Sequence, residues 1–252
     1  MSGLRVERQG AVAVLRLDKP RGNALDEPLV DALATAIAAA ADDPTVSGLL
    51  LTSARPDLFC PGLDLVALAG YAPSDLARFM RKFGALLVAL YGCPKPSLAA
   101  LSGHAVAGGC LLALTTDYRV LRRGGAMVGL NEARIGVPMP WPVTVLLRAT
   151  IPAPALTRVA LLGLNFQDDD AVTVGLVHEV ASQDRFEETC RARLAELTGR
   201  DPGAFATTKR WLRAPALAEM QTRDEDVETF VGSWFSPETQ ARLRAAVAEL
   251  TG

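Results

Sequence analysis

The chain lacks an excess of charge of either sign. Among its 252 residues, 26 Lys and Arg stand against 28 Asp and Glu, which gives a formal net charge of −2 at pH 7, and the two signs are mixed along the sequence. A protein that neutralises nucleic-acid phosphates needs a basic field, so this composition disfavours a nucleic-acid partner. Long apolar runs are also missing, because Gly, Pro or a charged residue interrupts each one. No transmembrane helix and no membrane partner are therefore predicted.

Cysteine is scarce and unclustered. The four cysteines, Cys60, Cys93, Cys110 and Cys190, form no C-x-x-C pair. This spacing disfavours a disulfide framework or a zinc site and favours isolated core thiols. The N-terminal residues have no apolar signal core and already include Glu7. Together these features predict a cytoplasmic protein.

Several nucleotide and hydrolase signatures are also absent. Gly103 and Gly108 have the spacing of a phosphate-loop start, but Gly109-Cys110 follows where Lys-Ser/Thr should stand. The same segment contains no G-x-G-x-x-G fingerprint of dinucleotide-binding folds. The chain has no G-x-S-x-G elbow, and neither His104 nor His178 lies near an acid and a serine at a recognisable spacing. Nucleoside triphosphate binding, NAD binding and serine hydrolysis are therefore not expected.

The stretch Leu98–Leu114 is the most informative one that is present. An apolar strand leads to a turn at Ser102-Gly103, then to Gly108-Gly109 and a run of helix formers. Two glycines before a helix let the backbone approach a ligand closely. They also leave the first helical amides unpaired at the positive end of the helix dipole, which suits an oxygen that gains negative charge. A packing turn that only brings helix and strand together is equally compatible.

Strands and helices alternate through the first half of the chain, which predicts an α/β fold with a parallel sheet. Expected are a hairpin (5–8 and 12–17), strands at 48–52, 98–101, 118–121 and 126–129, a helix from near Pro28 capped by Asp26 or Glu27, and a helix over 74–90 capped within 73–75. Three alternate prolines predict a stiff loop over 137–142. From Leu146 onward the chain reads as mostly helical, with helices at 187–197, 202–212, 224–230 and 237–250. We divide it into a core of residues 1–185 and a helical region of residues 186–252.

Two glycine-bearing loops each follow a predicted strand. In a parallel sheet such loops leave the same edge, where ligand crevices form. The amide of Leu63, which follows Gly62, and the amide of Gly108 could therefore converge on one oxygen. Paired backbone amides of this kind form an oxyanion hole, which stabilises charge that develops in a transition state.

Glu132 is the candidate base. It stands between a predicted strand and a proline-rich loop that contains Trp141. Burial among apolar groups would raise the pKa of its carboxyl and make it a better base near neutral pH. The alternative is a structural role, either as an acid at the start of a helix or in a surface salt bridge with Arg134. From the sequence alone, a glutamate more often has such a role than that of a base.

Other acidic residues and the histidines have simpler interpretations. Asp64 is expected to cap the turn that it closes, and Asp117 to tether Tyr118-Arg119. Asp168-Asp169-Asp170 resembles a metal cluster, but it directly precedes a helix, so first-turn charge is the better interpretation and no metal site is predicted. His104 is expected to be a turn residue rather than a base.

Taken together, three motifs resemble the crotonase (enoyl-CoA hydratase/isomerase) superfamily. They are Pro20–Leu25 (PRGNAL), Phe59–Leu65 (FCPGLDL) and Gly103–Cys110 (GHAVAGGC). Within that superfamily, four further segments resemble the mitochondrial-type Δ3,Δ2-enoyl-CoA isomerases: Ala107–Leu111, Asp117–Arg119, Gly129–Glu132 and Arg223–Phe230.

This resemblance implies an α/β fold of the ClpP/crotonase-like class, a spiral of ββα units with a helical C-terminal trimerisation region. It also implies an acyl-CoA substrate, a homotrimer or dimer of trimers, and a thioester oxygen held between the amides of Leu63 and Gly108. The residues implied to line the acyl-thioester site are Pro61, Gly62, Leu63, Asp64, Leu65 and Asn131, whereas Arg21 and Ala24 would contact the CoA moiety. The loop with Trp141 would shape the pocket that fixes chain length.

One position separates the reactions of this superfamily. Its hydratases carry a glutamate immediately after Gly-Gly-Cys, and this chain has Leu111 there. Adding water calls for two acid-base groups, whereas moving a double bond needs one base that takes a proton from C2 and returns it to C4. Leu111 and Glu132 therefore predict an isomerase that makes trans-2-enoyl-CoA from 3-enoyl-CoA without a metal or redox cofactor. The alternatives are another reaction on acyl-CoA, such as hydration or thioester hydrolysis, and a CoA-binding protein without turnover.

Overall fold

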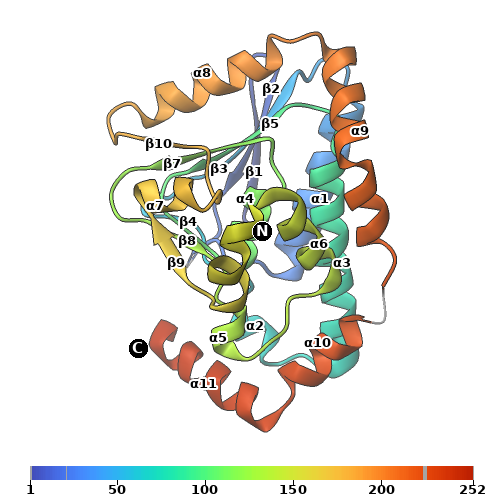
Figure 1. Cartoon of the computed structure of the whole chain (residues 1–252), viewed down its shortest axis with the longest axis vertical. Coiled ribbons are helices and arrows are strands. Elements are labelled where there is room, and N and C mark those ends of the chain that lie inside the picture. Colours follow the sequence, from blue (N-terminus) through green and yellow to red (C-terminus); the bar gives the residue numbers. More distant parts are fainter. Residues whose placement is uncertain (1, 21, 224–225, 252) are drawn as a thin grey trace.

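Two sheets form the framework of the protein (Figure 1). The computed structural model describes residues 2–20, 22–223 and 226–251. The larger sheet has six strands in the order β1-β2-β3-β5-β7-β10, and every neighbouring pair is parallel except the hairpin of β1 and β2. Its strands are β1 (Leu4–Gln9), β2 (Val12–Leu17), β3 (Gly48–Ser53), β5 (Ser97–Leu101), β7 (Tyr118–Arg122) and β10 (Glu179–Ala181). The predicted hairpin and parallel sheet are confirmed.

A smaller sheet carries the edge at which the candidate site lies. Its order is β4-β6-β8-β9, with β4, β6 and β8 parallel and β9 antiparallel to β8. The strands are β4 (Leu58–Cys60), β6 (His104–Val106), β8 (Met127–Gly129) and β9 (Asn165–Gln167). The chain passes from the large sheet to the small sheet and then to a helix in three successive turns: β3-β4-α2, β5-β6-α4 and β7-β8-α5. The structure therefore has the predicted ββα repeat.

Helices cover both faces of the large sheet. They are α1 (Glu27–Asp42), α2 (Leu65–Leu68), α3 (Pro73–Gly92), α4 (Gly108–Leu114), α5 (Glu132–Ile135), α6 (Trp141–Thr150), α7 (Asp168–Thr173), α8 (Phe186–Thr198), α9 (Pro202–Met220), α10 (Asp226–Trp234) and α11 (Pro237–Thr251). A short 3-10 turn (Ala153–Ala155) and a π turn (Thr157–Leu161) follow α6. Helix α8 packs on β5 and β7 with a small apolar cluster of its own, whereas α1, α3 and α4 share the main core on the other face.

Some local predictions are confirmed and others are wrong. Asp26 caps α1 by accepting a hydrogen bond from the Leu29 amide at 3.1 Å, as predicted. Helix α3 starts after Ala72 without a side-chain cap, so the cap predicted within 73–75 is wrong. The stiff loop predicted over 137–142 ends early, because α6 begins at Trp141 and Pro142 fits in its first turn, where no amide donor is needed.

Four short strands were missed, and the end of one long helix was placed too early. β4, β6, β9 and β10 have only three residues each, too few for a two-residue alternation to be visible in the sequence. Helix α9 continues to Met220 through Pro215, well past the predicted end at residue 212. The predicted start of α10 at residue 224 lies outside the described residues. The division at residue 185 stays a prediction.

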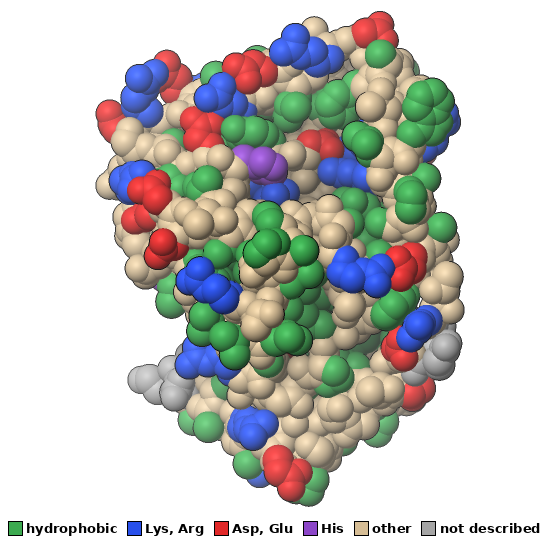
Figure 2. Space-filling model, viewed as in Figure 1, with side chains coloured by type: hydrophobic (Ala, Val, Ile, Leu, Met, Phe, Trp, Pro, Cys, Tyr) green, Lys and Arg blue, Asp and Glu red, His purple; other side chains and the backbone are tan. Residues whose placement is uncertain are grey.

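The surface and the cysteines agree with the composition. Figure 2 shows Lys, Arg, Asp and Glu side chains interspersed over one face, with hydrophobic side chains gathered near its middle. All four cysteines are buried and free, as predicted. No helix in the described part of the chain is long and apolar enough to cross a bilayer.

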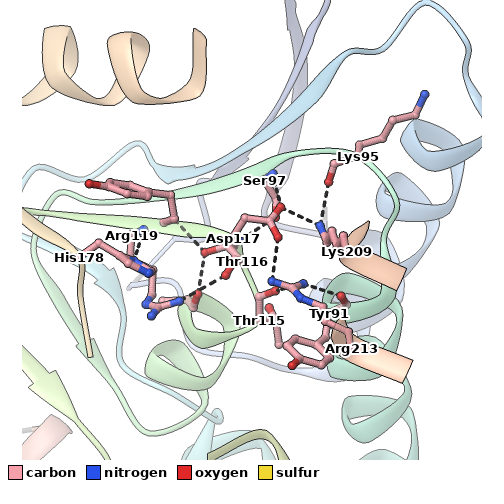
Figure 3. A network of polar contacts seen from close by, with 12 residues as sticks. Tyr91, Lys95, Ser97, Thr115, Thr116, Asp117, Arg119, His178, Lys209 and Arg213 are labelled. Carbon is pink, nitrogen blue, oxygen red and sulfur yellow. Dashed lines mark hydrogen bonds and ion pairs between the residues drawn. The ribbon is translucent and has the colours of Figure 1, made fainter. Parts of the chain in front are cut away.

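A buried ionic network fastens α9 to the sheet (Figure 3). The carboxylate of Asp117, directly before β7, accepts hydrogen bonds from the amide and hydroxyl of Ser97 at 2.8 and 2.9 Å. It also binds Lys209 Nζ and Arg213 Nη2 of α9, each at 2.7 Å. Asp117 is structural, as predicted, but the predicted partners Tyr118-Arg119 are wrong: its carboxylate holds Ser97 and two cations from a distant helix.

Candidate active site

Three loops meet at the carboxyl edge of the small sheet. They follow β4, β6 and β8, whose parallel pairing aligns Leu58 with His104 and Val106 with Gly129. The loops begin at Pro61, Ala107 and Leu130 and lead into α2, α4 and α5. The predicted convergence of the two glycine-bearing loops is therefore confirmed at the level of the chain path, and the segment with Glu132 joins them.

The first loop brings Gly62 against the start of α4. Gly62 has φ +105°, and a Cβ there would lie 2.9 Å from Ala107 Cβ and 3.2 Å from Gly108 N, so only glycine fits. Leu63 forms a bridge with Leu25, in which Leu25 N–H donates to Gly62 O at 2.8 Å and Asp64 N–H donates to Leu25 O at 2.9 Å. Leu25 thus bonds to the residues on either side of Leu63. The N–H of Leu63 itself points away from Leu25 and takes no part in this pairing.

The second loop holds its backbone in a strained conformation. Ala107, directly before α4, has φ +51° and ψ −126°, a region that residues with a side chain rarely occupy. Such strain costs about 1–3 kcal/mol and is often found at functional sites. The Ala107 N–H donates to Gly129 O at 2.8 Å, which fixes the turn. Gly109 is enclosed as well, since a Cβ there would lie 2.1 Å from Cys60 O.

The amides of Leu63 and Gly108 are both available as donors: neither N–H donates a hydrogen bond to another residue in the part of the chain that the structure describes. Gly108 is the first residue of α4, where helix geometry provides no acceptor. Unpaired backbone donors are uncommon inside proteins. Two such donors in adjoining loops can bind an oxygen atom of a ligand.

Glu132 begins α5 and turns its carboxyl into the protein. Its Oε2 is buried and has no hydrogen-bond partner among the described residues. Burial raises the pKa of Glu132 to about 7, against a smaller opposing effect of a backbone hydrogen bond. Among the described residues Glu132 forms no ion pair with Arg134, so the predicted surface salt bridge is wrong, although Glu132 is the first acid of a helix. A carboxyl in this setting is suited to proton transfer near neutral pH.

The start of α4 lies near Glu132. Cys110 lies close enough to interact electrostatically with Glu132, and burial raises the pKa of its thiol, so the thiol stays protonated. Leu111, the next residue, is 3% exposed and packs in the main core. No second acid therefore stands beside Glu132 on this element.

Other residues predicted at the site have mixed positions. Pro61 is exposed, and Leu65 and Asn131 are half-buried at the starts of α2 and α5; the Asn131 side chain does not cap α5. Asp64 caps α2 by accepting from Ala67 N at 3.1 Å, as predicted. Its carboxylate also pairs with Lys19 Nζ at 2.8 Å, so it is already occupied by protein groups.

The CoA-contact residues come from the loop after β2. Ala24 is half-buried, and its carbonyl accepts a hydrogen bond from Lys19 Nζ at 2.8 Å. Arg21 lies outside the described residues. Lys19 also pairs with Asp26 at 2.8 Å, so one ammonium ties this loop to α1 and to the Asp64 loop. Sequence reasoning missed Lys19, because its partners are dispersed and no local motif indicates them.

Trp141 lies beside a separate apolar cavity of about 310 Å³ between α3, α6, α9 and α10. Its indole N–H donates to Glu219 O at 2.9 Å, and the Arg223 guanidinium stacks 4.0 Å from the ring centroid. Phe83 also lines this cavity, and a Cβ on Gly108 would lie 3.4 Å from Phe83 Cζ. The cavity is thus separated from the Gly108 amide by one aromatic ring.

The remaining polar candidates are structural. His104 is on β6 rather than in a turn, and its Nδ1 accepts from the Met127 amide at 3.0 Å. The three aspartates at 168–170 form the first turn of α7, as predicted, and Asp169 pairs with Arg123 at 2.8 Å. The described residues contain no group of three or more His, Cys, Asp or Glu that could hold a metal.

Comparisons with known proteins agree with this architecture. The family model described as enoyl-CoA hydratase/isomerase matches residues 7–241. The human mitochondrial enoyl-CoA delta isomerase 1 is 32% identical over 241 residues, which are 95% of this chain and 80% of that protein. The carnitinyl-CoA dehydratase of Salmonella typhi is 30% identical over 212 residues, 84% of this chain and 80% of that protein.

Solved structures extend the agreement to the whole fold. The crystal structure of human mitochondrial delta3-delta2-enoyl-CoA isomerase superimposes with a TM-score of 0.94 at 30% identity, covering 98% of each chain. An enoyl-CoA hydratase/isomerase from Xanthobacter autotrophicus Py2 gives 0.84 at 27% identity, with coverage of 99% and 97%. The predicted crotonase fold is confirmed. The chain is a member of the enoyl-CoA hydratase/isomerase family and an enzyme of that family.

Proposed function

We propose that this enzyme is a Δ3,Δ2-enoyl-CoA isomerase, which converts 3-enoyl-CoA to trans-2-enoyl-CoA. Two observations carry the proposal. Glu132 Oε2 is buried without a hydrogen-bond partner among the described residues, and the position after Gly-Gly-Cys is Leu111. A single base suffices to move a proton between two carbons, whereas hydration calls for two acid-base groups. The likeness to the human isomerase supports the same reaction.

The mechanism uses the two unpaired amides and the carboxylate. The thioester oxygen binds between the N–H groups of Leu63 and Gly108. Glu132 removes a proton from C2, the electrons move into a dienolate, and the amides stabilise the negative charge on its oxygen. The protonated Glu132 then delivers the same proton to C4, and the double bond comes to lie between C2 and C3. A pKa of about 7 lets the carboxyl both accept and release this proton at neutral pH.

The other site roles are part of this proposal. Pro61, Gly62, Leu65 and Asn131 line the acyl-thioester site, and Arg21 and Ala24 contact CoA. Trp141 and the apolar cavity behind Phe83 limit the length of the acyl chain. For Asp64 we propose a supporting role, because Lys19 and the α2 amides occupy its carboxylate. No metal or redox cofactor takes part, and the enzyme acts in the cytoplasm.

We also propose that the enzyme assembles as a homotrimer or a dimer of trimers. Several large apolar side chains are exposed on the single chain, among them Leu161, Trp211 and Leu212 at 73%, 70% and 77%. Exposed apolar groups of this size are typical of surfaces that contact another protein. Sedimentation of the purified protein tests this assembly.

Hydration is the competing reaction, because a carnitinyl-CoA dehydratase is also a relative. The decisive test incubates the enzyme with 3-enoyl-CoA and follows the conjugated 2-enoyl thioester by its ultraviolet absorbance. A parallel reaction starts from 2-enoyl-CoA and follows loss of the same absorbance through hydration. We expect rapid formation in the first reaction and negligible loss in the second. Efficient hydration without migration of the double bond would reverse the assignment, and release of free CoA would indicate a thioesterase.

A further inference from the structure

Helix α11 contacts both halves of the candidate site. It packs against α2, which directly follows the Leu63 loop, and against α5, which begins with Glu132 (Figure 1). Leu243 anchors α11 in the main core at 6% exposure. One helix from the end of the chain thus lies against the element that carries the base and the element beside one of the two amides.

The contact with α5 is centred on Gly136. Gly136 ends α5 in the left-handed conformation, with φ +88°. Thr239 is 3% exposed, and its hydroxyl donates to Gly136 O at 3.1 Å. A Cβ on Gly136 would lie 2.9 Å from Thr239 Oγ1 and 2.5 Å from Arg242 Nη1. Side chains of α11 therefore pack directly against the Cα of Gly136.

Two hydrogen bonds in series connect Thr239 to the main chain of Glu132. Gly136 accepts from Thr239 through its carbonyl and donates through its N–H to Glu132 O at 3.0 Å. Helix α5 is four residues long and has no side-chain cap; besides the Thr239 contact, it is held by Ile135 against the main core and by the Val137 amide, which donates to Glu132 O at 3.2 Å. So short a helix is not stable by itself and depends on tertiary contacts.

We propose that Thr239 is a positioning residue, which fixes the Glu132 carboxyl through the Gly136 cap. This inference rests on the proposed function only for its kinetic consequence. Without the hydroxyl, the Gly136 carbonyl loses its partner and α5 shifts or frays, so that water reaches the carboxyl. A displacement of about 1 Å at a reacting group can reduce a rate by about 10²-fold.

The electrostatic surroundings of Glu132 make its ionisation a direct readout of this role. Burial is the main cause of the raised pKa of Glu132, and the charged or titratable groups on neighbouring elements include Cys110 on α4, Arg134 on α5, and Glu238 and Arg242 on α11. Changing Thr239 alters none of them. A change in the pKa of Glu132 in such a variant would therefore report hydration of the carboxyl and not the loss of a neighbouring charge.

The test compares Thr239→Val with Thr239→Ser, which keeps the hydroxyl. The control is Thr198→Val, which removes a similar hydroxyl-to-carbonyl hydrogen bond (3.0 Å to Leu194 O) at the end of α8. For Thr239→Val we expect kcat to fall about tenfold with KM within about twofold, and the acidic limb of the kcat profile to move to lower pH. Thr239→Ser should restore both, and Thr198→Val should change neither.

A second readout does not need turnover. Carboxyl ¹³C NMR, with the Glu132 resonance assigned by comparison with Glu132→Gln, follows the ionisation of Glu132 directly. A lower pKa in Thr239→Val than in the native protein supports the proposal even if the native enzyme does not isomerise 3-enoyl-CoA, in which case only the proposed function fails. An unchanged Glu132 titration, or equal impairment of Thr239→Ser and Thr239→Val, would overturn it.

Discussion

Two carboxyl groups shielded from water, those of Asp117 and Glu132, differ in how their negative charge is compensated. Asp117 stands just before β7, and its oxygens are surrounded by the donors of Ser97, Lys209 and Arg213 (Figure 3). Glu132 stands just after β8, and its Oε2 has no donor within the described chain. A buried anion is tolerated only when its charge is matched, or else it takes up a proton. The first carboxylate is therefore suited to holding elements together and the second to exchanging protons.

The difference follows from where the two residues lie on their strands. Asp117 lies at the amino end of β7, where α9 presents two cations to it. Glu132 lies at the opposite, carboxyl end of the small sheet, where Gly62 and Gly108 keep side chains out of the way. In the proposed mechanism, the thioester oxygen of the substrate binds the Leu63 and Gly108 amides at this edge, and C2 and C4 lie beside Glu132. Replacing Glu132 should therefore lower the reaction rate, whereas replacing Asp117 should lower the stability of the fold.

Replacing Glu132 should have the largest effect on the rate. Glu132→Gln keeps the shape of the side chain but removes the base, so we expect isomerase kcat to fall by about 10²–10⁴-fold. Circular dichroism should show an unchanged fold. Glu187→Gln, an exposed change on α8, serves as the control. Activity of Glu132→Gln near that of the native enzyme would contradict the role of Glu132 as the base.

Replacing the paired carboxylate should instead act on stability. Asp117→Ala leaves Lys209 and Arg213 buried without their counter-charge, and we expect a loss of about 3–5 kcal/mol in the free energy of unfolding. Urea unfolding measures it. The control is Asp169→Ala, which removes an exposed ion pair with Arg123 and should cost less than about 1 kcal/mol. Equal losses in the two variants would show that the buried network contributes little.

Crowding the Gly108 amide should reduce the rate without removing any acid. In Gly62→Ala, the added methyl would press on Ala107 and on the Gly108 amide, so we expect kcat to fall by about 10²-fold, as when one oxyanion donor is lost. Gly10→Ala is the matched control, because Gly10 also has positive φ but nothing lies within 4 Å of an added Cβ. It should lower stability slightly and leave kcat unchanged. A full-rate Gly62→Ala enzyme would exclude an oxyanion site at Gly108.

These contrasts also show which parts of the site could be predicted from sequence. Glu132 and the loops at Gly62 and Gly108 were found because each lies a few residues after a strand, so that local pattern and sheet topology place them together. The Lys19 pair with Asp64 and the Thr239 contact at Gly136 were not found. They join residues 45 and 103 positions apart by single hydrogen bonds or ion pairs. No periodicity in a sequence encodes such contacts, which depend on how whole elements pack.

The rate should follow the ionisation of Glu132. Because the base must be ionised to accept the C2 proton, kcat should fall about tenfold for each pH unit below about 7. Steady-state rates between pH 5 and 8.5 on a saturating 3-enoyl-CoA measure this limb. An acidic limb near the ordinary glutamate value of 4.5 would mean that the carboxyl is hydrated in the complex.

The smallest effect should appear in the stability of the protein as a function of pH. Burial favours the neutral carboxyl in the folded state, so between pH 4.5 and 7 the folded protein binds a proton that the unfolded chain does not. Stability conferred by this residue is therefore present at low pH and is lost as the pH rises through about 7. Glu132→Gln lacks this titration, so it should gain stability relative to the native enzyme as the pH rises from 5 to 8 in urea unfolding. Parallel stability curves would show that Glu132 ionises as easily in the folded protein as in water. Asp117→Asn should instead be destabilised at both pH 5 and pH 8, because it removes the counter-charge of Lys209 and Arg213.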